Sequence, residues 1–173
     1  MVSAQDAKAL CKLLEQHNIR FWVMGGWGVD ALIQRQTRLH KDLDILALLG
    51  DLPRLQSLFA EQGFTLKLIW EENRWIDVDG GPDRWPTAFV VADAQGRELD
   101  VHVIDIGPDG VIIQCYDNQW PLPNAPTGQG SIAGVLVTCV SRETQIAMHT
   151  GYTLPEAHLR DLELLQVGSD TSL

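Results

Sequence analysis

The sequence predicts an α+β fold, a mixed β-sheet flanked by helices with short helices at its C-terminal end. Three features of the pattern support this fold class. Helical and strand-like segments alternate in the first third of the chain, strand-like segments follow one another in the middle, and helical periodicity returns at the end. Because the middle strands are consecutive, we expect a mixed sheet rather than a doubly wound parallel one.

The chain of 173 residues, 45% of them hydrophobic, is long enough to form one well-packed core. We therefore expect a single domain over residues 1–168, followed by a disordered tail at 169–173. Two independent domains are not expected at this length.

The first half of the chain begins with a helix. Ser3 and Asp6 have the spacing of a capping box, which predicts a helix over residues 4–17. Its buried face should carry Ala7, Leu10, Cys11 and Leu14. The same criteria predict, in order, a strand at 20–24, a helix at 26–33, a strand at 42–48 and a helix that begins near Leu52 and is ended by Gly63.

The second half is richer in strands. The turn sequence Asp93–Gly96 should join strands at 87–91 and 99–104 as a hairpin. Ser141 should cap a helix that runs through His149. Other expected elements are strands at 64–70, 75–78, 111–115 and 134–140, a surface loop at 117–130, and a last helix capped by Thr153 and Glu156 with Leu159, Leu162 and Leu165 on one face.

The net charge limits the kinds of partner. A formal charge of −10 argues against a nucleic-acid partner, because proteins that grip phosphate backbones carry an excess of Lys and Arg. An acidic surface favours cationic small molecules, although solubility alone explains this composition equally well. No apolar segment reaches the roughly 18 residues of a spanning helix, and the N-terminus does not read as a signal peptide. We therefore expect a cytoplasmic protein with no membrane partner.

The cysteines suggest neither disulfides nor a metal. Cys11, Cys115 and Cys139 are odd in number, widely spaced and without the spacing of zinc ligands. Buried, reduced thiols are therefore the expected state of these side chains.

The candidate site begins with a glycine pair, Gly25-Gly26, that directly follows an apolar strand. Glycine has no Cβ, so a phosphate can approach the backbone N–H groups of such a turn, and the helix that starts there favours an anion. Asp42 and Asp44 then lie two residues apart in the next strand, which places both on one face. Carboxylates held in this way suit Mg²⁺, which takes its other ligands from water and substrate phosphates.

A third carboxylate, Asp100, lies in an apolar strand where an unpaired charge would be costly. Together the three aspartates predict a pair of Mg²⁺ ions and in-line displacement at phosphorus, with ATP or another nucleoside triphosphate as co-substrate. Asp100 is the candidate third ligand, the general base, or both. His102, on the same strand face, competes for the role of base, and a structural histidine is about as probable.

These motifs resemble those of the DNA-polymerase-β-like nucleotidyltransferases, and more narrowly the lincosamide nucleotidyltransferases and aminoglycoside 2''-adenylyltransferases. The resemblance covers residues 5 to about 165. It is carried by Gly25-Gly-Trp-Gly-Val-Asp30, Arg38-Leu-His-Lys-Asp-Leu-Asp-Ile45, Leu99-Asp-Val-His102, Ser141-Arg-Glu-Thr-Gln145 and His149-Thr-Gly-Tyr152.

The resemblance implies a nucleotidyltransferase fold and transfer of a nucleoside monophosphate, usually AMP, to a hydroxyl of an antibiotic. It implies that Gly25 and Gly26 contact the phosphates of the nucleotide, and that Arg38 and His40 contact the triphosphate or orient the aspartates. It also implies that Asp42, Asp44 and Asp100 bind metal and that His149 and Tyr152 lie near the site. Asp30 is expected to be a structural hydrogen-bonding residue.

The acceptor is the open question. A compact lincosamide is preferred to an aminoglycoside, whose several charges would require more acidic residues in the pocket. The acidic residues of the segment at 71–84 keep the aminoglycoside possible, namely Glu71, Glu72, Asp77, Asp79 and Asp83. Trp75, Trp85, Trp120, His102 and Tyr152 are the candidate acceptor-binding residues, with Trp70 a further candidate wall.

Two other functions remain as alternatives. One is modification of a protein or RNA, as in toxin–antitoxin pairs, which the low basicity disfavours for RNA. The other is a catalytically silent nucleotide-binding or antitoxin-like module, which should have lost one of the three carboxylates that this chain keeps. A homodimer is plausible, since a short chain offers limited surface with which to enclose an acceptor.

Overall fold

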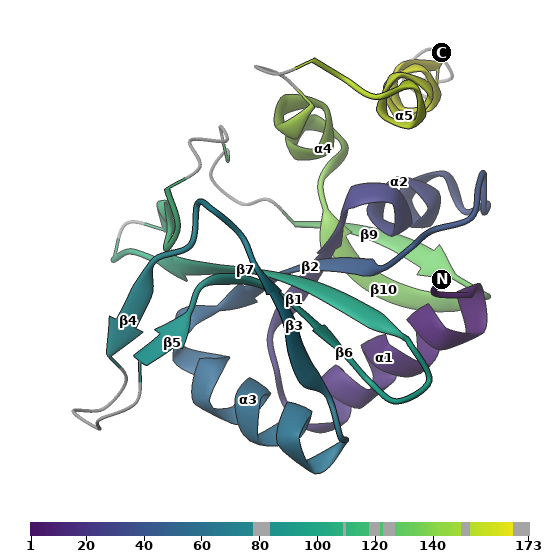
Figure 1. Cartoon of the computed structure of the whole chain (residues 1–173). Helices are drawn as coiled ribbons and strands as arrows, with labels where there is room; N and C mark the ends of the chain where they lie inside the picture. Colours follow the sequence, from purple (N-terminus) through teal and green to yellow (C-terminus); the bar gives the residue numbers. More distant parts are fainter. Residues whose placement is uncertain (78–83, 109, 118–121, 123–126, 150–152, 168–173) are drawn as a thin grey trace.

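The computed structural model describes residues 1–77, 84–108, 110–117, 122, 127–149 and 153–167. It confirms the α+β prediction, with a mixed sheet and helices on both of its faces (Figure 1). The helices are α1 (Ala4–Gln16), α2 (Gly25–Ile33), α3 (Leu52–Glu61), α4 (Arg142–Met148) and α5 (Glu156–Val167), and η1 (Leu49–Asp51) is a 3-10 turn. The strands are β1 (Phe21–Met24), β2 (Leu43–Leu48), β3 (Thr65–Ile69), β4 (Trp75–Asp77), β5 (Arg84–Pro86), β6 (Ala88–Ala92), β7 (Glu98–Ile106), β8 (Ile112–Gln114), β9 (Thr127–Ile132) and β10 (Val135–Val140).

The main sheet has the strand order β3-β6-β7-β2-β1-β10-β9, and β8 pairs with β7. The central strands β2 and β7 are parallel, whereas β1 runs antiparallel to β2. Their register aligns Met24 with Asp44, and Asp44 with Asp100. The end of β1 therefore meets the beginnings of β2 and β7 at one edge of the sheet, which is where the glycine pair begins α2.

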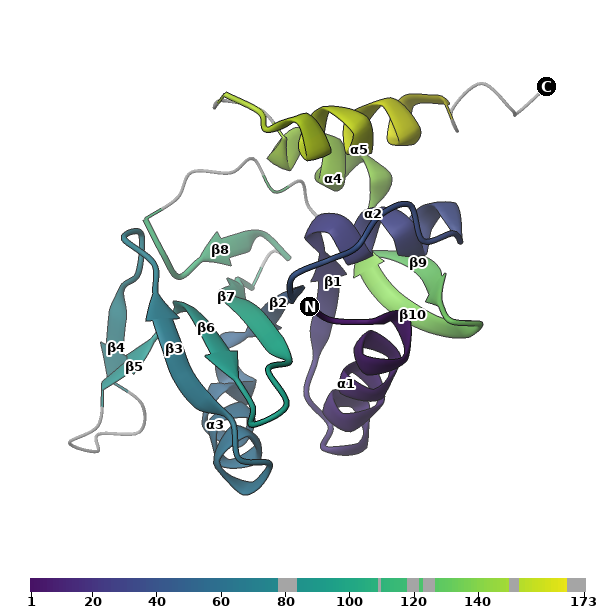
Figure 2. The same cartoon turned by 45° about the vertical axis from the view of Figure 1, so that its right-hand side comes forward.

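The two faces of the sheet carry different layers. Helices α1 and α3 cover one face, while α4 and α5 lie on the opposite side (Figures 1 and 2). Along β2 the side chains alternate, because successive residues of a strand point to opposite faces. Ile45 and Ala47 join the core that includes α1 and α3, whereas Leu46 and Leu48 join a second cluster with Met148 of α4. Asp44 shares the parity of Leu46 and therefore faces the α4 side.

Several local predictions are confirmed. Ser3 and Asp6 form the capping box of α1, and the four predicted apolar residues of that helix are buried. Strands β6 and β7 pair antiparallel across the predicted turn at 93–96. The three cysteines are free thiols, but only Cys11 and Cys139 are buried as expected, while Cys115 is half-buried. Burial raises the pKa of Cys11 to about 12.

Among the described residues, no helix has the length and apolar character to cross a membrane.

The predicted loop at 117–130 is wrong at its end, where residues 127–132 form β9 and pair with β10. Its polar, glycine-rich sequence hides the strand because glycine has a low strand propensity. The glycines are there for packing: a Cβ on Gly130 would lie 2.9 Å from the Cβ of Ala31, so α2 approaches β9 closely at this point. Residues 118–121 and 123–126 lie outside the described residues, as does the predicted tail at 169–173.

Two other expectations need correction. Strand β5 was not predicted, because its short sequence has no alternating pattern. It pairs antiparallel with β4, with Trp75 opposite Pro86. The last helix does not bury Leu159, which is 48% exposed. Leu165 and Asp161 are its buried side chains, because Asp161 meets Arg38 from the candidate site.

Candidate active site

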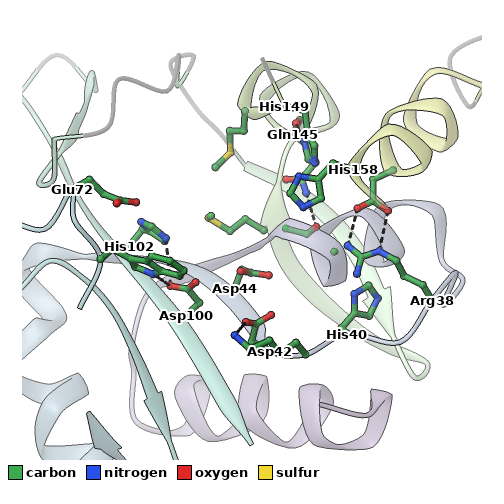
Figure 3. A pocket seen from close by; sticks show the side chains of 17 residues that line it. Arg38, His40, Asp42, Asp44, Glu72, Asp100, His102, Gln145, His149 and His158 are labelled. Carbon is green, nitrogen blue, oxygen red and sulfur yellow. Dashed lines mark hydrogen bonds and ion pairs between the residues drawn. The ribbon is translucent and has the colours of Figure 1, made fainter. Parts of the chain in front are cut away.

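The edge of the sheet where β1 ends opens into a cavity of about 410 Å³. Side chains from β2 and β7 form its floor, and residues of α4 and α5 form the wall above (Figure 3). Every candidate nucleotide or metal residue from the sequence lines this cavity: Gly25, Gly26, Arg38, His40, Asp42, Asp44 and Asp100. His102 lines it as well.

The three aspartates converge at the centre of the cavity. A carboxylate oxygen of each of Asp42, Asp44 and Asp100 lies within 4.8 Å of those of the other two. Burial, together with the neighbouring carboxylates, raises the pKa of Asp44 well above its usual value. The pKa of Asp42 is also raised by burial, although the ammonium group of Lys41 opposes this shift. The site therefore concentrates negative charge that the protein itself balances only in part.

Asp100 is held by hydrogen bonding on one side of the carboxylate. The indole Nε1 of Trp70 donates to Asp100 Oδ1 over 2.9 Å, and His102 Nε2 lies 3.4 Å from the same oxygen. This arrangement fixes the orientation of the carboxyl group. His102 is therefore placed as a neighbour of Asp100, as well as a lining residue of the cavity.

The glycine pair is required by close approach. Gly25 has a φ of +58°, which favours glycine, and a Cβ there would lie 2.7 Å from Asp44 Cγ. A Cβ on Gly26 would lie 2.6 Å from a guanidinium nitrogen of Arg38. The turn thus leaves room for both the carboxylate and the cation that face it.

Arg38 and His40 are both anchored by carboxylates outside the trio. Arg38 Nη2 pairs with Asp161 of α5 at 2.9 Å, and this hydrogen bond raises the pKa of the guanidinium group. His40 Nε2 lies 2.5 Å from Asp30, and its ring packs at 4.5 Å against that of Trp27. Asp30 also accepts from the backbone and hydroxyl of Thr37, so its expected structural role is confirmed.

The wall above the aspartates comes from the C-terminal helices. Gln145 Nε2 donates to the carbonyl of Gly25 over 2.6 Å, which fixes α4 against the glycine turn. His149 ends α4, and its ring centroid lies 5.1 Å from that of His158. Burial lowers the pKa of His158, and the neighbouring His149 and Arg38 add to this effect. The C-terminal helices therefore present two imidazoles to the cavity, and Arg38 and His40 from the segment between α2 and β2 line it as well.

Some candidate acceptor residues lie elsewhere. Trp75 and Trp85 line a separate apolar cavity with Phe59, Phe64 and Phe89, because the β4–β5 hairpin folds toward α3 rather than toward the aspartates. Trp120 and Tyr152 fall outside the described residues. Trp70, the further candidate, does line the aspartate cavity.

Several lining residues were missed because only the tertiary fold brings them to the site. Asp161 and His158 come from α5, more than a hundred residues beyond the glycine pair. Lys41 lies within the Arg38–Ile45 motif and pairs with Asp42 at 3.5 Å, but it was not proposed as a site residue. Its position next to Asp42 was the one signal that could have identified it. Glu72, by contrast, was one of the acidic residues considered for an aminoglycoside pocket, and it does line the cavity.

The donor set fits a divalent cation with a preference for oxygen. The three carboxylates supply such ligands, and Lys41 is the one Lys or Arg in the described residues that forms an ion pair with the trio. Opposite them lie a glycine turn at a helix start and the guanidinium group of Arg38. Both are groups that bind phosphate.

The α+β sheet and the carboxylate trio beside a glycine turn define the class of protein: this is a nucleotidyltransferase fold. The chain belongs to the aminoglycoside-2''-adenylyltransferase family, whose model matches residues 7–165.

Known antibiotic-resistance proteins are similar to this chain. A lincosamide resistance protein of Staphylococcus haemolyticus is 24% identical in an alignment that covers 95% of each chain. The lincomycin-bound crystal structure of the lincosamide antibiotic adenylyltransferase LnuA superposes with a TM-score of 0.77 at 24% identity, covering 95% of this chain and 97% of that one. The solution structure of the antibiotic-resistance factor ANT(2'')-Ia gives a TM-score of 0.71 at 19% identity, covering 98% and 86%.

Proposed function

We propose that this protein transfers AMP from ATP to a hydroxyl group of a lincosamide antibiotic, releasing pyrophosphate and conferring resistance. The observation that carries the proposal is the carboxylate trio, with oxygens within 4.8 Å of one another beside the glycine turn. Nucleotide transfer needs such a trio, because the attacking hydroxyl, the α-phosphate and the leaving group must be aligned and their charge neutralised. Family membership and the lincosamide resistance relative support the antibiotic acceptor.

Asp42, Asp44 and Asp100 would hold two Mg²⁺ ions, because one Mg²⁺ ion usually binds only one or two protein carboxylates and this site offers three. Bound Mg²⁺ supplies neutralisation of the triphosphate charge. The backbone N–H groups at Gly25 and Gly26 and the guanidinium of Arg38 bind the phosphates. His40 lines the same side of the cavity.

In the proposed reaction the acceptor oxygen forms a bond to the α-phosphorus and the bond to pyrophosphate breaks. The hydroxyl proton passes to Asp100, whose carboxylate is oriented by Trp70. His102 is the competing base, because its Nε2 lies 3.4 Å from Asp100. A pH profile of transfer by His102→Gln, compared with that of the wild type, distinguishes the two assignments.

An aminoglycoside 2''-adenylyltransferase is the second candidate, and the description of the family favours it. We test both with a panel of lincosamides and aminoglycosides incubated with Mg²⁺ and each nucleoside triphosphate, read by mass spectrometry. A nucleoside-monophosphate adduct on a lincosamide is expected. The absence of an adduct on either class would exclude the antibiotic function and return the silent-module alternative.

The proposal also covers the domain organisation, location and assembly of the protein. We infer a single nucleotidyltransferase domain over residues 1–168 that acts in the cytoplasm on small molecules, without a nucleic-acid or membrane partner. A homodimer is the proposed assembly, in which a second subunit helps to enclose the acceptor. Light scattering at working concentration tests this assembly, and a monomeric mass for an active sample would exclude it.

A further inference from the structure

The cavity has two chemically different sides. Arg38, His40, His149 and His158 lie along one side, and Glu72, Asp100 and His102 lie along the other (Figure 3). A triphosphate belongs on the side that carries the guanidinium and imidazoles. The acceptor then occupies the side of Asp100, since the base must reach its hydroxyl.

The acidic residues of the cavity are almost all committed. Asp161 pairs with Arg38 at 2.9 Å, and the aspartate trio is the proposed metal site. Glu72 is the one remaining carboxylate among the described lining residues. Its side chain forms no ion pair or hydrogen bond within the described part of the chain, although it is half-buried. The carboxylate is therefore available to a cation that enters the cavity.

The position of Glu72 is fixed by a turn between β3 and β4. The amide of Asn73 donates to the carbonyl of Trp70 over 3.1 Å, and the carbonyl of Glu72 accepts from the amide of Asp117 over 2.7 Å. Asn73 Oδ1 in turn accepts from the amide of Thr87 over 2.7 Å. The turn therefore holds Trp70 and Glu72 at the cavity on a rigid support.

The nearest cationic side chain in the sequence, Arg74, does not pair with Glu72. Arg74, two residues further along, pairs with the carboxylate of Asp117. Asp77 of β4 is the next acidic residue considered for acceptor binding. It pairs with Arg84 of β5 at 3.4 Å and does not line the cavity. Glu71 is exposed and does not line it either.

We propose that Glu72 binds the ammonium group of the acceptor and that this single free carboxylate selects an acceptor with one cationic centre over a polycation. The inference rests on the proposed function and deepens it. An amine held at Glu72 places the rest of a compact molecule along Trp70 toward Asp100, where its hydroxyl is activated. A polycation would leave its other ammonium groups without partners among the described lining residues.

The test compares the wild type with Glu72→Gln and with the matched control Glu71→Gln, using ATP, Mg²⁺ and a lincosamide that carries one amine. For Glu72→Gln we expect the KM for the lincosamide to rise on the order of tenfold, because a charge-assisted hydrogen bond is lost. The kcat and the KM for ATP should change by less than about twofold. Glu71→Gln should match the wild type in all three constants.

A second measurement separates recognition of charge from a structural role. The wild-type KM for the lincosamide should rise as pH passes the pKa of the acceptor amine, and this rise should be absent in Glu72→Gln. A wild-type KM for the lincosamide in Glu72→Gln, or a higher kcat/KM for an aminoglycoside than for the lincosamide, would overturn the inference.

The failure of the proposed function is seen separately, as no adduct from the wild type with either antibiotic class. In that case calorimetric titration of the lincosamide into wild type and Glu72→Gln still tests the inference. Weaker binding by the variant supports it, and equal or undetectable binding by both overturns it.

Discussion

Asp44 and Asp51 lie near opposite ends of strand β2, and they are carboxylates in opposite electrostatic states. Asp51 is 1% exposed, yet its pKa is lowered: burial opposes the charge, but the amide and side chain of Arg20 and the side chain of Arg54 outweigh that effect. Asp44 faces other carboxylates, and its pKa is raised well above the usual value by burial and by those neighbours.

The difference separates a structural carboxylate from a functional one. Asp51 has its partners within the chain, where its Oδ2 accepts from the amide of Arg20 over 2.9 Å and from Arg20 Nε over 3.1 Å. Asp44 lacks such compensation, so its charge is available to a bound cation. Substitution of each aspartate by asparagine should therefore affect different properties of the protein.

The largest effect is expected for Asp44→Asn. We expect nucleotide transfer to fall about a thousandfold or more, because one of three metal-binding carboxylates is lost. The melting temperature without metal should stay close to that of the wild type, since a repulsive charge is removed. Mass spectrometry of the adduct and a thermal scan measure the two properties. Retained turnover would remove Asp44 from the metal site.

The addition of Mg²⁺ sharpens this comparison. Together with a nucleoside triphosphate it should raise the melting temperature of the wild type but not that of Asp44→Asn, because a ligand that binds the native state stabilises it. Chelation by EDTA should abolish both the stabilisation and turnover. An equal gain in both proteins would place the metal elsewhere.

A smaller loss of activity, on the order of a hundredfold, is expected for Gly25→Ala. The new Cβ would overlap with the carboxyl group of Asp44 and displace it. Gly63→Ala is the matched control, because Gly63 also has a positive φ, +72°, but nothing lies within 4 Å of its Cβ position. Both variants bear a similar backbone strain of about 1 kcal/mol. Equal kcat values would therefore show that this strain, and not the overlap with Asp44, causes the loss of activity.

The same pair of aspartates shows what the sequence can reveal. Asp44 could be predicted as a site residue because glycines and a second aspartate surround it in a recognisable order. No such pattern identifies Asp51, since its partner Arg20 lies 31 residues away. Short-range patterns predicted the helices and most strands.

Contacts between distant parts of the chain could not be predicted from the sequence. The contact of Arg38 with Asp161 depends on how α5 packs against α2, and the lining position of Glu72 depends on one turn. The displacement of Trp75 and Trp85 to another cavity depends on the direction of a hairpin. None of these leaves a periodic signal in the chain.

Asp51→Asn should reduce stability rather than activity. We expect a loss of about 2 kcal/mol in the free energy of unfolding, at the low end for a buried charged group because Arg20 and Arg54 are more than half exposed to solvent. This corresponds to a fall of about 4–8 °C in melting temperature. The kcat of the folded fraction should be unchanged. Asp77→Asn, an exposed aspartate paired with Arg84, is the control and should melt as the wild type does.

The smallest effect is the pH dependence of that stability difference. Because the pKa of Asp51 is lower in the folded than in the unfolded state, its contribution is fully present above the unfolded pKa of about 3.9 and is lost as pH falls through the folded pKa. The gap in unfolding free energy between wild type and Asp51→Asn should therefore be constant from about pH 8 to pH 5 and narrow below about pH 4. Urea titrations across this range measure it. A gap that widened on acidification would mean that Asp51 is stabilised in its protonated form, and its contrast with Asp44 would disappear.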